Sequence, residues 1–326
     1  ATVLFDVKPV PEPISAEDDW LPSPSPSSAQ LAAKGVGGLA KIPLALARRA
    51  ERAVSHPRET AARAGELASA VGEVAWNFAN PAPTLPLNVP IGSHRRFVWV
   101  RSDLAQFKRI KDVLGGTVND VVLAVVGGGV RDWLQARGVK TDGMEVRAQV
   151  PVSIRGKDEH GGLGNRITAM RAVLPVYIED PVLRLERVRE QMQDLKDSRQ
   201  ALGAEVISRF NDFAPPTLLA QAARINFSTR LFNMVVTNVP GPQLPIYLLG
   251  RELEDVFPVG FLPPDQTLFV AIMSYNGAVN FGLLADYDSM DDVQLIADGI
   301  EGALVDLGAA AEEVRREEQA AAHAEA

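Results

Sequence analysis

The 326-residue sequence contains no cysteine. This absence excludes disulfide bonds, thiolate nucleophiles and zinc sites built from cysteine ligands. Histidine is scarce: the four histidines are scattered, and none has the paired spacing of a zinc protease motif. We interpret them as incidental surface residues, and they are His56, His94, His160 and His323.

Long hydrophobic runs and strong positive charge are also missing. The longest apolar run, residues 121–130, has about half the length that a membrane-spanning helix needs. The formal net charge of −8 argues against a nucleic-acid-binding protein, which usually presents a basic face. Hydrophobic residues make up 46% of the chain and charged residues 23%, a balance typical of a globular protein.

Two familiar catalytic signatures are absent. No serine lies in a G-x-S-x-G elbow, which leaves no position for the nucleophile of an α/β-hydrolase. The glycine run 127–129 is not followed by the Lys-Ser/Thr pair of a phosphate-binding loop. We therefore expect these glycines to permit close packing of helices.

The distribution of proline divides the chain into four regions. Prolines interleaved with serines predict an extended linker over residues 1–28. Residues 29–94 form an alanine-rich, largely helical connecting region, and its basic residues could make either a solvated helix face or a surface that contacts anionic lipid. Residues 95–308 are predicted to be the main domain, and residues 309–326 an Ala/Glu-rich tail that we expect to be frayed.

Strand and helix patterns alternate in the main domain. Apolar, β-branched runs predict strands at 97–100, 146–152, 167–175, 234–237, 268–274 and 279–285. Helical spacing and capping signals predict helices over 103–114, from 117, from 181, over 204–224 and over 289–307. This succession predicts an α/β fold with a mixed sheet flanked by helices.

Four polar clusters stand out against these apolar elements. Thr117 and Asp120 have the spacing of a capping box, which explains Asp120 by helix capping alone but leaves Asn119 unexplained. Arg155 follows a buried strand, where it could bind an anion or form a structural ion pair. Asn165 precedes the next strand, and residues 238–242 form a proline-containing turn that places the amide of Asn238 at its mouth.

Read in order, these clusters resemble the bacterial wax ester synthase/diacylglycerol acyltransferase family over about residues 85–307. A Pro-Leu-Asn string at 86–88 and the arginines at 95–96 match the upstream part of the same pattern. The strings that carry the resemblance are Thr117–Ala124 (TVNDVVLA), Pro151–Arg155 (PVSIR), Gly164–Arg166 (GNR), Asn238–Pro242 (NVPGP) and Asn280–Leu283 (NFGL).

The resemblance implies a chloramphenicol acetyltransferase-like, coenzyme A-dependent acyltransferase fold, mainly its C-terminal half. It also implies transfer of a fatty acyl group from acyl-coenzyme A to diacylglycerol or a long-chain alcohol, with no covalently bound cofactor and no metal. In the family, an HHxxxDG motif in the N-terminal half supplies the general base, but this sequence has no His-His pair. We therefore expect the motif to lie before residue 1 or in a separate chain. The resemblance further implies a cytoplasmic protein, peripheral on membranes or lipid bodies.

Site residues are carried over by matching the motifs. Asn119 and Asp120 correspond to the family's Asn-Asp motif, which would line or brace the substrate tunnel. Asn238 and the turn through Gly241 and Pro242 would shape its wall. Arg155 and Asn165 are further candidates for substrate contact. The alternatives are a non-catalytic relative that binds lipid or protein, and a condensation-domain relative, which the TVND and NVPGP strings disfavour.

Overall fold

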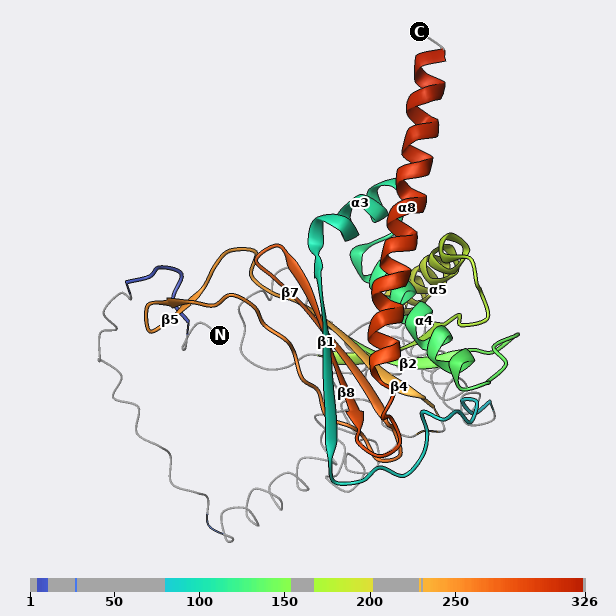
Figure 1. Cartoon of the computed structure of the whole chain (residues 1–326), viewed down its shortest axis with the longest axis vertical. Helices are drawn as coiled ribbons and strands as arrows, with labels where there is room; N and C mark the ends of the chain where they lie inside the picture. Colours follow the sequence, from blue (N-terminus) through green and yellow to red (C-terminus); the bar gives the residue numbers. More distant parts are fainter. Residues whose placement is uncertain are drawn as a thin grey trace, which may run out of the picture. The chain divides into compact units, whose positions relative to one another are not determined.

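The computed structural model describes residues 5–10, 27, 80–153, 167–201, 229 and 231–324. The chain divides into two compact units, residues 12–79 and the remainder, and nearly all of the described residues belong to the second of these. Within that unit, helices pack against a mixed sheet (Figure 1). Its elements are β1 (Arg95–Asp103), α3 (Leu104–Leu114), α4 (Val118–Ala136), β2 (Val146–Ser153), β3 (Ile167–Leu174), α5 (Pro181–Ala201), β4 (Met234–Pro240), β5 (Tyr247–Leu248), β6 (Arg251–Glu252), β7 (Leu268–Tyr275), β8 (Ala278–Asp286) and α8 (Gln294–Ala324).

The six-stranded sheet has the order β1-β8-β7-β4-β2-β3. Its three middle strands β7, β4 and β2 run parallel, while β1, β8 and β3 pair antiparallel with their neighbours. The carboxyl ends of the three parallel strands therefore meet at one edge of the sheet. In α/β sheets, such edges are common places for binding sites.

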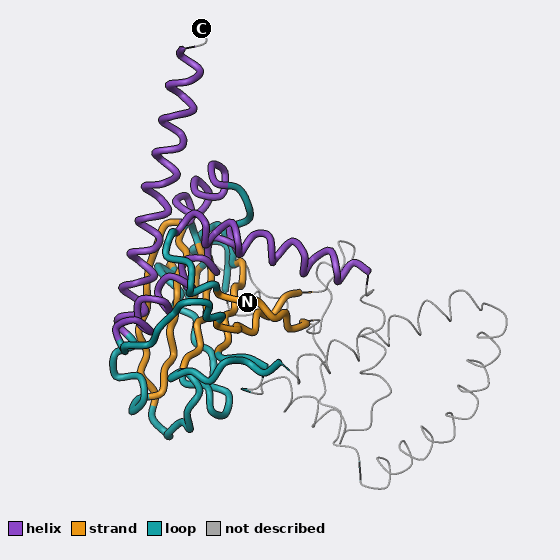
Figure 2. The backbone as a smooth tube through the Cα atoms, turned by 90° about the vertical axis from the view of Figure 1, so that its right-hand side faces the viewer, coloured by secondary structure: helices purple, strands orange, loops and turns teal. Residues whose placement is uncertain are grey.

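The two faces of the sheet differ in how they are covered. On one face, alternate strand residues such as Val236, Val270 and Phe281 join the helices in one large core. Figure 2 shows the helices gathered along that face. The other face carries a small apolar cluster of Val235, Phe269, Ala271 and Leu284. Both faces of β7 and β8 are thus apolar, which explains why these strands read as nearly continuous hydrophobic runs.

Helix α4 is the central helix of the layer and packs closely on α8. The predicted role of the glycine run is confirmed, because a Cβ atom at Gly129 would lie 2.6 Å from the backbone oxygen of Ile296 in α8. Gly127 and Gly128 face the side chain of Arg184, which is buried between α4 and α5. Larger residues at these positions would push α8 or Arg184 away from α4.

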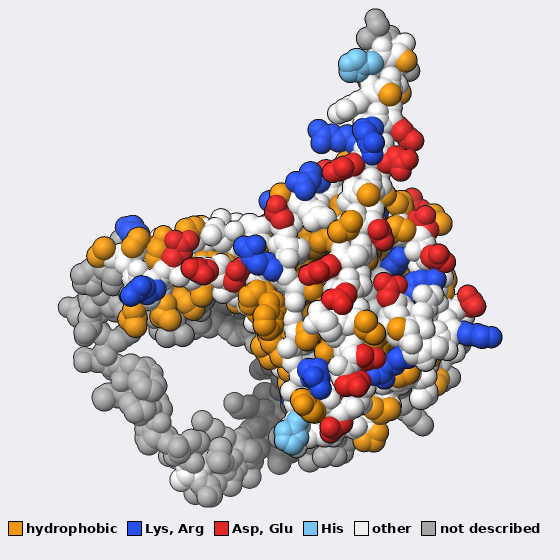
Figure 3. All heavy atoms as spheres, viewed as in Figure 1, with side chains coloured by type: hydrophobic (Ala, Val, Ile, Leu, Met, Phe, Trp, Pro, Cys, Tyr) orange, Lys and Arg blue, Asp and Glu red, His pale blue; other side chains and the backbone are white. Residues whose placement is uncertain are grey.

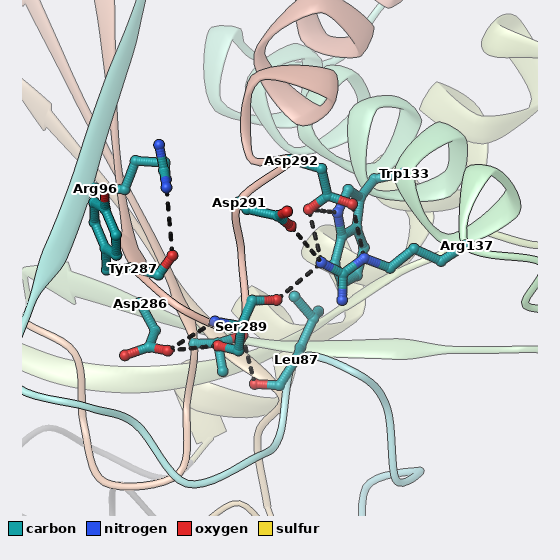
Figure 4. Close-up of polar contacts among 10 residues, drawn as sticks. Leu87, Arg96, Trp133, Arg137, Asp286, Tyr287, Ser289, Asp291 and Asp292 are labelled. Atoms are coloured by element: carbon teal, nitrogen blue, oxygen red, sulfur yellow. Dashed lines mark hydrogen bonds and ion pairs between the residues drawn. The ribbon is translucent and has the colours of Figure 1, made fainter.

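A polar network ties the carboxyl end of α4 to the segment that precedes α8 (Figure 4). Arg137 donates to both carboxylate oxygens of Asp292, over 2.8 and 2.7 Å, and Trp133 Nε1 donates to Asp292 Oδ1 over 2.9 Å. Nearby, Asp286 at the end of β8 accepts from the backbone N–H and the hydroxyl of Ser289. These bonds fix the orientation of α4 and α8 over the sheet. They lie at the end of β8, opposite to the edge where the three parallel strands end.

The predicted elements that fall within the described residues are largely confirmed, apart from the bounds of the last helix and one additional hairpin. The last helix starts at Gln294 rather than 289 and continues to Ala324, so the expectation of a frayed tail is wrong. The alanines, glutamates and arginines of residues 309–324 are strong helix formers and extend the helix beyond its buried part. The short hairpin of β5 and β6 was not predicted, and the predicted helix 204–224 lies outside the described residues.

Within the described part of the chain, no single helix has both the length and the apolar character needed to cross a bilayer. Helices α3 and α4 reach that length together, but the chain bends by 101° between them.

Candidate functional site

A cavity of about 430 Å³ lies where the parallel strands end and α4 begins. It lies on the helix-covered side of the sheet, and five of its described lining residues are apolar. Among the described lining residues, none carries an ionisable carboxylate, amine or imidazole. Its walls are formed by Leu104, Thr117, Val118, Asn119, Pro151, Asn238, Pro240, Ser274 and Val279.

The alternation of strand residues explains how polar groups reach this cavity. In β4, Val236 belongs to the core, and the next residue on the same face is Asn238. In β7, Ile272 belongs to the core, and the next residue on that face is Ser274. Each strand therefore changes from apolar to polar at its carboxyl end, where the packed helices stop covering it.

The start of α4 is fixed by the predicted capping box. Asp120 Oδ2 accepts from the backbone N–H and the hydroxyl of Thr117, both over 2.8 Å, and the Thr117 hydroxyl accepts from the Asp120 backbone N–H over 3.3 Å. Asp120 is buried and does not line the cavity. Its side chain stabilises the first turn of α4, which agrees with the helix-capping role that the sequence indicated.

Asn119, the next residue back, points to the cavity and contacts a distant strand. Its Oδ1 accepts a hydrogen bond from Nδ2 of Asn238 over 3.1 Å. Among the described residues, neither Asn119 Nδ2 nor Asn238 Oδ1 has another protein partner. The pair therefore leaves the Nδ2 group of Asn119 to donate and Oδ1 of Asn238 to accept at the cavity.

The turn after β4 is packed against the end of β7. A Cβ atom at Gly241 would clash with the backbone oxygen of Ser274, so only glycine fits there without a shift of the strand. The backbone oxygen of Pro242 accepts from Asn276 N over 3.0 Å, which ties the same turn to the β7–β8 connection. Gly241 and Pro242 thus shape the rim, while neither belongs to the cavity lining.

Two predicted site residues, Arg155 and Asn165, lie outside the described residues, as do His56 and His160. His94 is described and lies just before β1, whose nine residues separate it from the cavity by about 30 Å at ~3.3 Å per residue. His323 lies in the last turn of α8, beyond the buried part of that helix. No group of three or more acidic or histidine residues that could hold a metal ion occurs among the residues that the structure describes.

Sequence reasoning missed Ser274 and its partner Gln243. Ser274 ends an apolar strand in the same way as Asn238, and this change of character was the available signal. Gln243 Nε2 donates to Ser274 Oγ over 3.1 Å, a contact that depends on how the turn folds back. Spacing in the sequence does not reveal such a contact.

A second, larger groove of about 530 Å³ lies between α3 and α8. Its charged lining residues, which include Arg109, Asp112, Glu312 and Arg315, alternate in sign along two exposed helix faces. None of the predicted site residues that the structure describes lines this groove. We therefore place the candidate site at the smaller cavity, which brings together Asn119 and Asn238 from two separate motifs.

Two protein-family models match the sequence. The one described as the wax ester synthase/diacylglycerol acyltransferase catalytic domain matches residues 2–122, and the one described as the WS/DGAT C-terminal domain matches residues 163–308. The first match covers the region predicted as linker and connecting helices and extends through the Asn-Asp string. Between them, the matches include Asn119, Asp120, Asn165 and the turn at 238–242.

Curated relatives of the chain carry names from the same family. The chain is 33% identical over 283 residues to Rv1760 of Mycobacterium tuberculosis, which is named as a putative diacylglycerol O-acyltransferase. The matched region covers 85% of this chain and 55% of that protein. It is 32% identical to the O-acyltransferase WSD of Acinetobacter baylyi, over 68% of this chain and 48% of the relative. The chain therefore spans about half the length of these relatives.

The wax ester synthase/diacylglycerol acyltransferase of Marinobacter aquaeolei VT8 has a similar solved structure. The two superpose with a TM-score of 0.55 at 24% identity, over 75% of this chain and 56% of the other. At this identity the likeness shows the fold. The predicted fold class, a mixed sheet flanked by helices in the acyltransferase arrangement, is confirmed.

Proposed function

The chain belongs to the wax ester synthase/diacylglycerol acyltransferase family, and we propose that it forms the part of an O-acyltransferase that binds substrate but does not supply the base. In this proposal, acyl-coenzyme A donates a fatty acyl group to diacylglycerol or to a long-chain alcohol. The products are triacylglycerol or a wax ester, and the released group is coenzyme A.

The single observation that carries this proposal is the chemistry of the cavity lining. Amide and hydroxyl groups of Asn119, Asn238 and Ser274 lie beside apolar side chains such as Leu104 and Val279. Such a lining suits a neutral carbonyl or hydroxyl group attached to a hydrocarbon chain. The described part of this lining offers no group able to accept a proton near neutral pH.

Acyl transfer requires such a group because a neutral hydroxyl is a poor nucleophile. The hydroxyl oxygen must bond to the thioester carbonyl carbon while its proton is removed. The carbon–sulfur bond then breaks, and the coenzyme A sulfur receives the proton. We propose that an imidazole from an HHxxxDG motif outside residues 1–326 carries this proton, in the remaining half of the polypeptide or in a separate chain.

The surface of the unit supports the need for a further polypeptide. On the face opposite to the helices, Trp99, Val259 and Phe261 are 57%, 62% and 58% exposed. Figure 3 shows hydrophobic side chains gathered over β1 and along the arm that carries β5, which we define as residues 243–262. Exposed apolar patches of this kind mark contact surfaces. Lipid substrates also suggest peripheral contact with a membrane or lipid body.

The test is to combine the chain with a polypeptide that supplies the remaining part of the relatives' length, including an HHxxxDG motif. Acyl-coenzyme A would be offered with hexadecanol and, separately, with dioleoylglycerol. We expect ester formation by the combination, and none by either piece or by a combination in which the second motif histidine is replaced by alanine. Ester formation by residues 1–326 alone would contradict the proposed division of roles.

A second candidate function is non-catalytic binding of a lipid or protein by the same fold. Of the two described histidines, neither His94, before β1, nor His323, near the end of α8, lines the cavity, which favours this function for the chain taken alone. It would replace the first proposal if the combined polypeptides bind acyl-coenzyme A without forming ester with either acceptor.

A further inference from the structure

The hydroxyl group of Ser274 is held in one orientation at the wall of the cavity. Its Oγ accepts a hydrogen bond from the backbone N–H of Gly241 over 3.3 Å and a second one from Nε2 of Gln243 over 3.1 Å. A serine hydroxyl has two acceptor lone pairs and one proton to donate. Both acceptor positions are therefore occupied, and only the donor remains.

The direction of the second bond follows from the surroundings of Gln243. Its Oε1 accepts from the backbone N–H of Gly277 over 3.1 Å, and its Nε2 also donates to the backbone oxygen of Gly241 over 3.1 Å. Rotating the Gln243 amide by 180° would place its Nε2 against the N–H of Gly277 and its Oε1 against the backbone oxygen of Gly241. Gln243 can thus only donate to Ser274.

The hydroxyl proton of Ser274 is therefore available to a ligand in the cavity. Among the described residues, the structure gives the Ser274 hydroxyl no protein acceptor, and Ser274 is one of the lining residues. Asn119, on the facing turn of α4, lines the same cavity with a donor group of its own. A directed donor in an apolar wall favours an oxygen atom of a neutral ligand.

We propose that Ser274 donates a hydrogen bond to the thioester carbonyl oxygen of the acyl donor, and that Gln243 is the positioning residue that aims it. This inference rests on the proposed function and adds the residue that contacts the reacting group. As the acceptor oxygen bonds to the carbonyl carbon, negative charge develops on the carbonyl oxygen, and a fixed donor stabilises it. The charge returns to the carbonyl when the carbon–sulfur bond breaks.

Three substitutions separate this role from a structural one. Ser274→Ala removes the donor, and Ser274→Thr keeps a hydroxyl. Gln243→Glu replaces the amide donor with an acceptor, which would draw the Ser274 proton away from the cavity. Ser289→Ala is the matched control, because that hydroxyl binds Asp286 at the opposite end of β8 and has only a structural role.

The first measurement is kcat/KM for acyl transfer by the combined polypeptides. We expect about a 10²-fold loss, mainly in kcat, for Ser274→Ala and Gln243→Glu, the size found when one such donor is removed. Ser274→Thr should recover most of the activity, and Ser289→Ala should leave kcat unchanged. Wild-type kcat in Ser274→Ala would overturn the inference.

The second measurement does not depend on turnover. A ketone analogue of acyl-coenzyme A, with a methylene between the carbonyl and the sulfur, would be bound to each variant, and the carbonyl stretch would be recorded by difference infrared spectroscopy. We expect a lower frequency in the wild type and the Thr variant than in the Ala and Glu variants. The same frequency in wild type and Ser274→Ala would overturn the inference even if ester forms, whereas a serine-dependent shift without any ester would support it and count against the proposed function.

Discussion

The side-chain amide of Asn238 donates a hydrogen bond to Asn119 Oδ1 over 3.1 Å and thereby joins the carboxyl end of β4 to the first turn of α4. The two residues come from strings that lie 119 positions apart in the sequence. The bond fixes the orientation of both amides at the cavity. It also couples the position of α4 to the turn after β4, which contains Gly241.

This coupling can be measured by a double-mutant cycle with Asn119→Ala and Asn238→Ala. Each single change should lower the free energy of unfolding by about 1 kcal/mol, because each removes the same bond. The double variant should lose about 1 kcal/mol less than the sum of the two singles. Denaturant unfolding checks this. Asn238→Ala combined with the exposed, distant Gln294→Ala is the control and should be additive, and additivity of the asparagine pair would contradict the coupling.

Local features of the site were predictable from the sequence, and contacts between distant segments were not. The capping box of Thr117 and Asp120 spans three residues, so its spacing determines its geometry. The meeting of Asn119 with Asn238 depends on β4 lying between β2 and β7, an order that helix and strand patterns do not specify. The family resemblance placed both residues at one site without giving their contact.

The same limit applies to glycine and to the last helix. The spacing of the glycine run 127–129 indicated close packing, but not that α8 would be the partner. The end of α8 was misjudged because residues 309–324 lack the apolar periodicity of a packed helix, while their intrinsic helix propensity is high. Pattern reasoning detects burial more readily than helix formation without burial.

Gly241→Ala and Gly302→Ala should have opposite effects on stability. At Gly241 the added methyl group would clash with the Ser274 backbone oxygen, and we expect a loss of about 1–3 kcal/mol in the free energy of unfolding. Gly302 lies exposed in α8, and its added methyl group would meet no atom within 4 Å, so alanine should stabilise the protein by up to about 1 kcal/mol. Urea unfolding of both variants provides the comparison, and equal midpoints would refute the packing described for the turn.

Asp292 should contribute stability that depends on pH. Burial of its carboxyl group opposes ionisation, but hydrogen bonds from Arg137 and Trp133 outweigh burial, and the pKa of Asp292 lies below its ordinary value of 3.8. A lowered pKa means that the ionised form stabilises the folded state. Its contribution is complete above pH 3.8 and is lost as the pH falls through the folded-state pKa.

Asp292→Asn should therefore lower the free energy of unfolding by about 1–2 kcal/mol at pH 7 and by progressively less below pH 3.8. Urea unfolding of both proteins from pH 7 to pH 2.5 would trace the difference. The exposed Asp298→Asn serves as the control for the loss of one negative charge near the start of α8. A difference that grows as the solution becomes more acidic would show that the sign of the pKa shift is wrong.

In the hairpin of β5 and β6, Leu249 and Gly250 have φ values of +51° and +77°. Hairpin turns with two positive φ angles favour asparagine at the first position, because a leucine there is strained. Leu249 is nevertheless 90% exposed and gains little from packing within this chain. Leu249→Asn should therefore stabilise the isolated chain by up to about 1 kcal/mol in denaturant unfolding.

If the arm contacts the polypeptide that completes the proposed enzyme, the same change should act in the opposite direction on assembly. A leucine at the tip would bury apolar surface in the contact, and asparagine would not, so the dissociation constant should rise by about tenfold. Leu244→Asn is the matched control, because Leu244 is half as exposed, at 46%, and is not among the residues with positive φ. Its replacement should bring no gain in stability. A more stable chain with unchanged assembly would show that relief of strain is the whole effect and that the tip of the hairpin lies outside the contact.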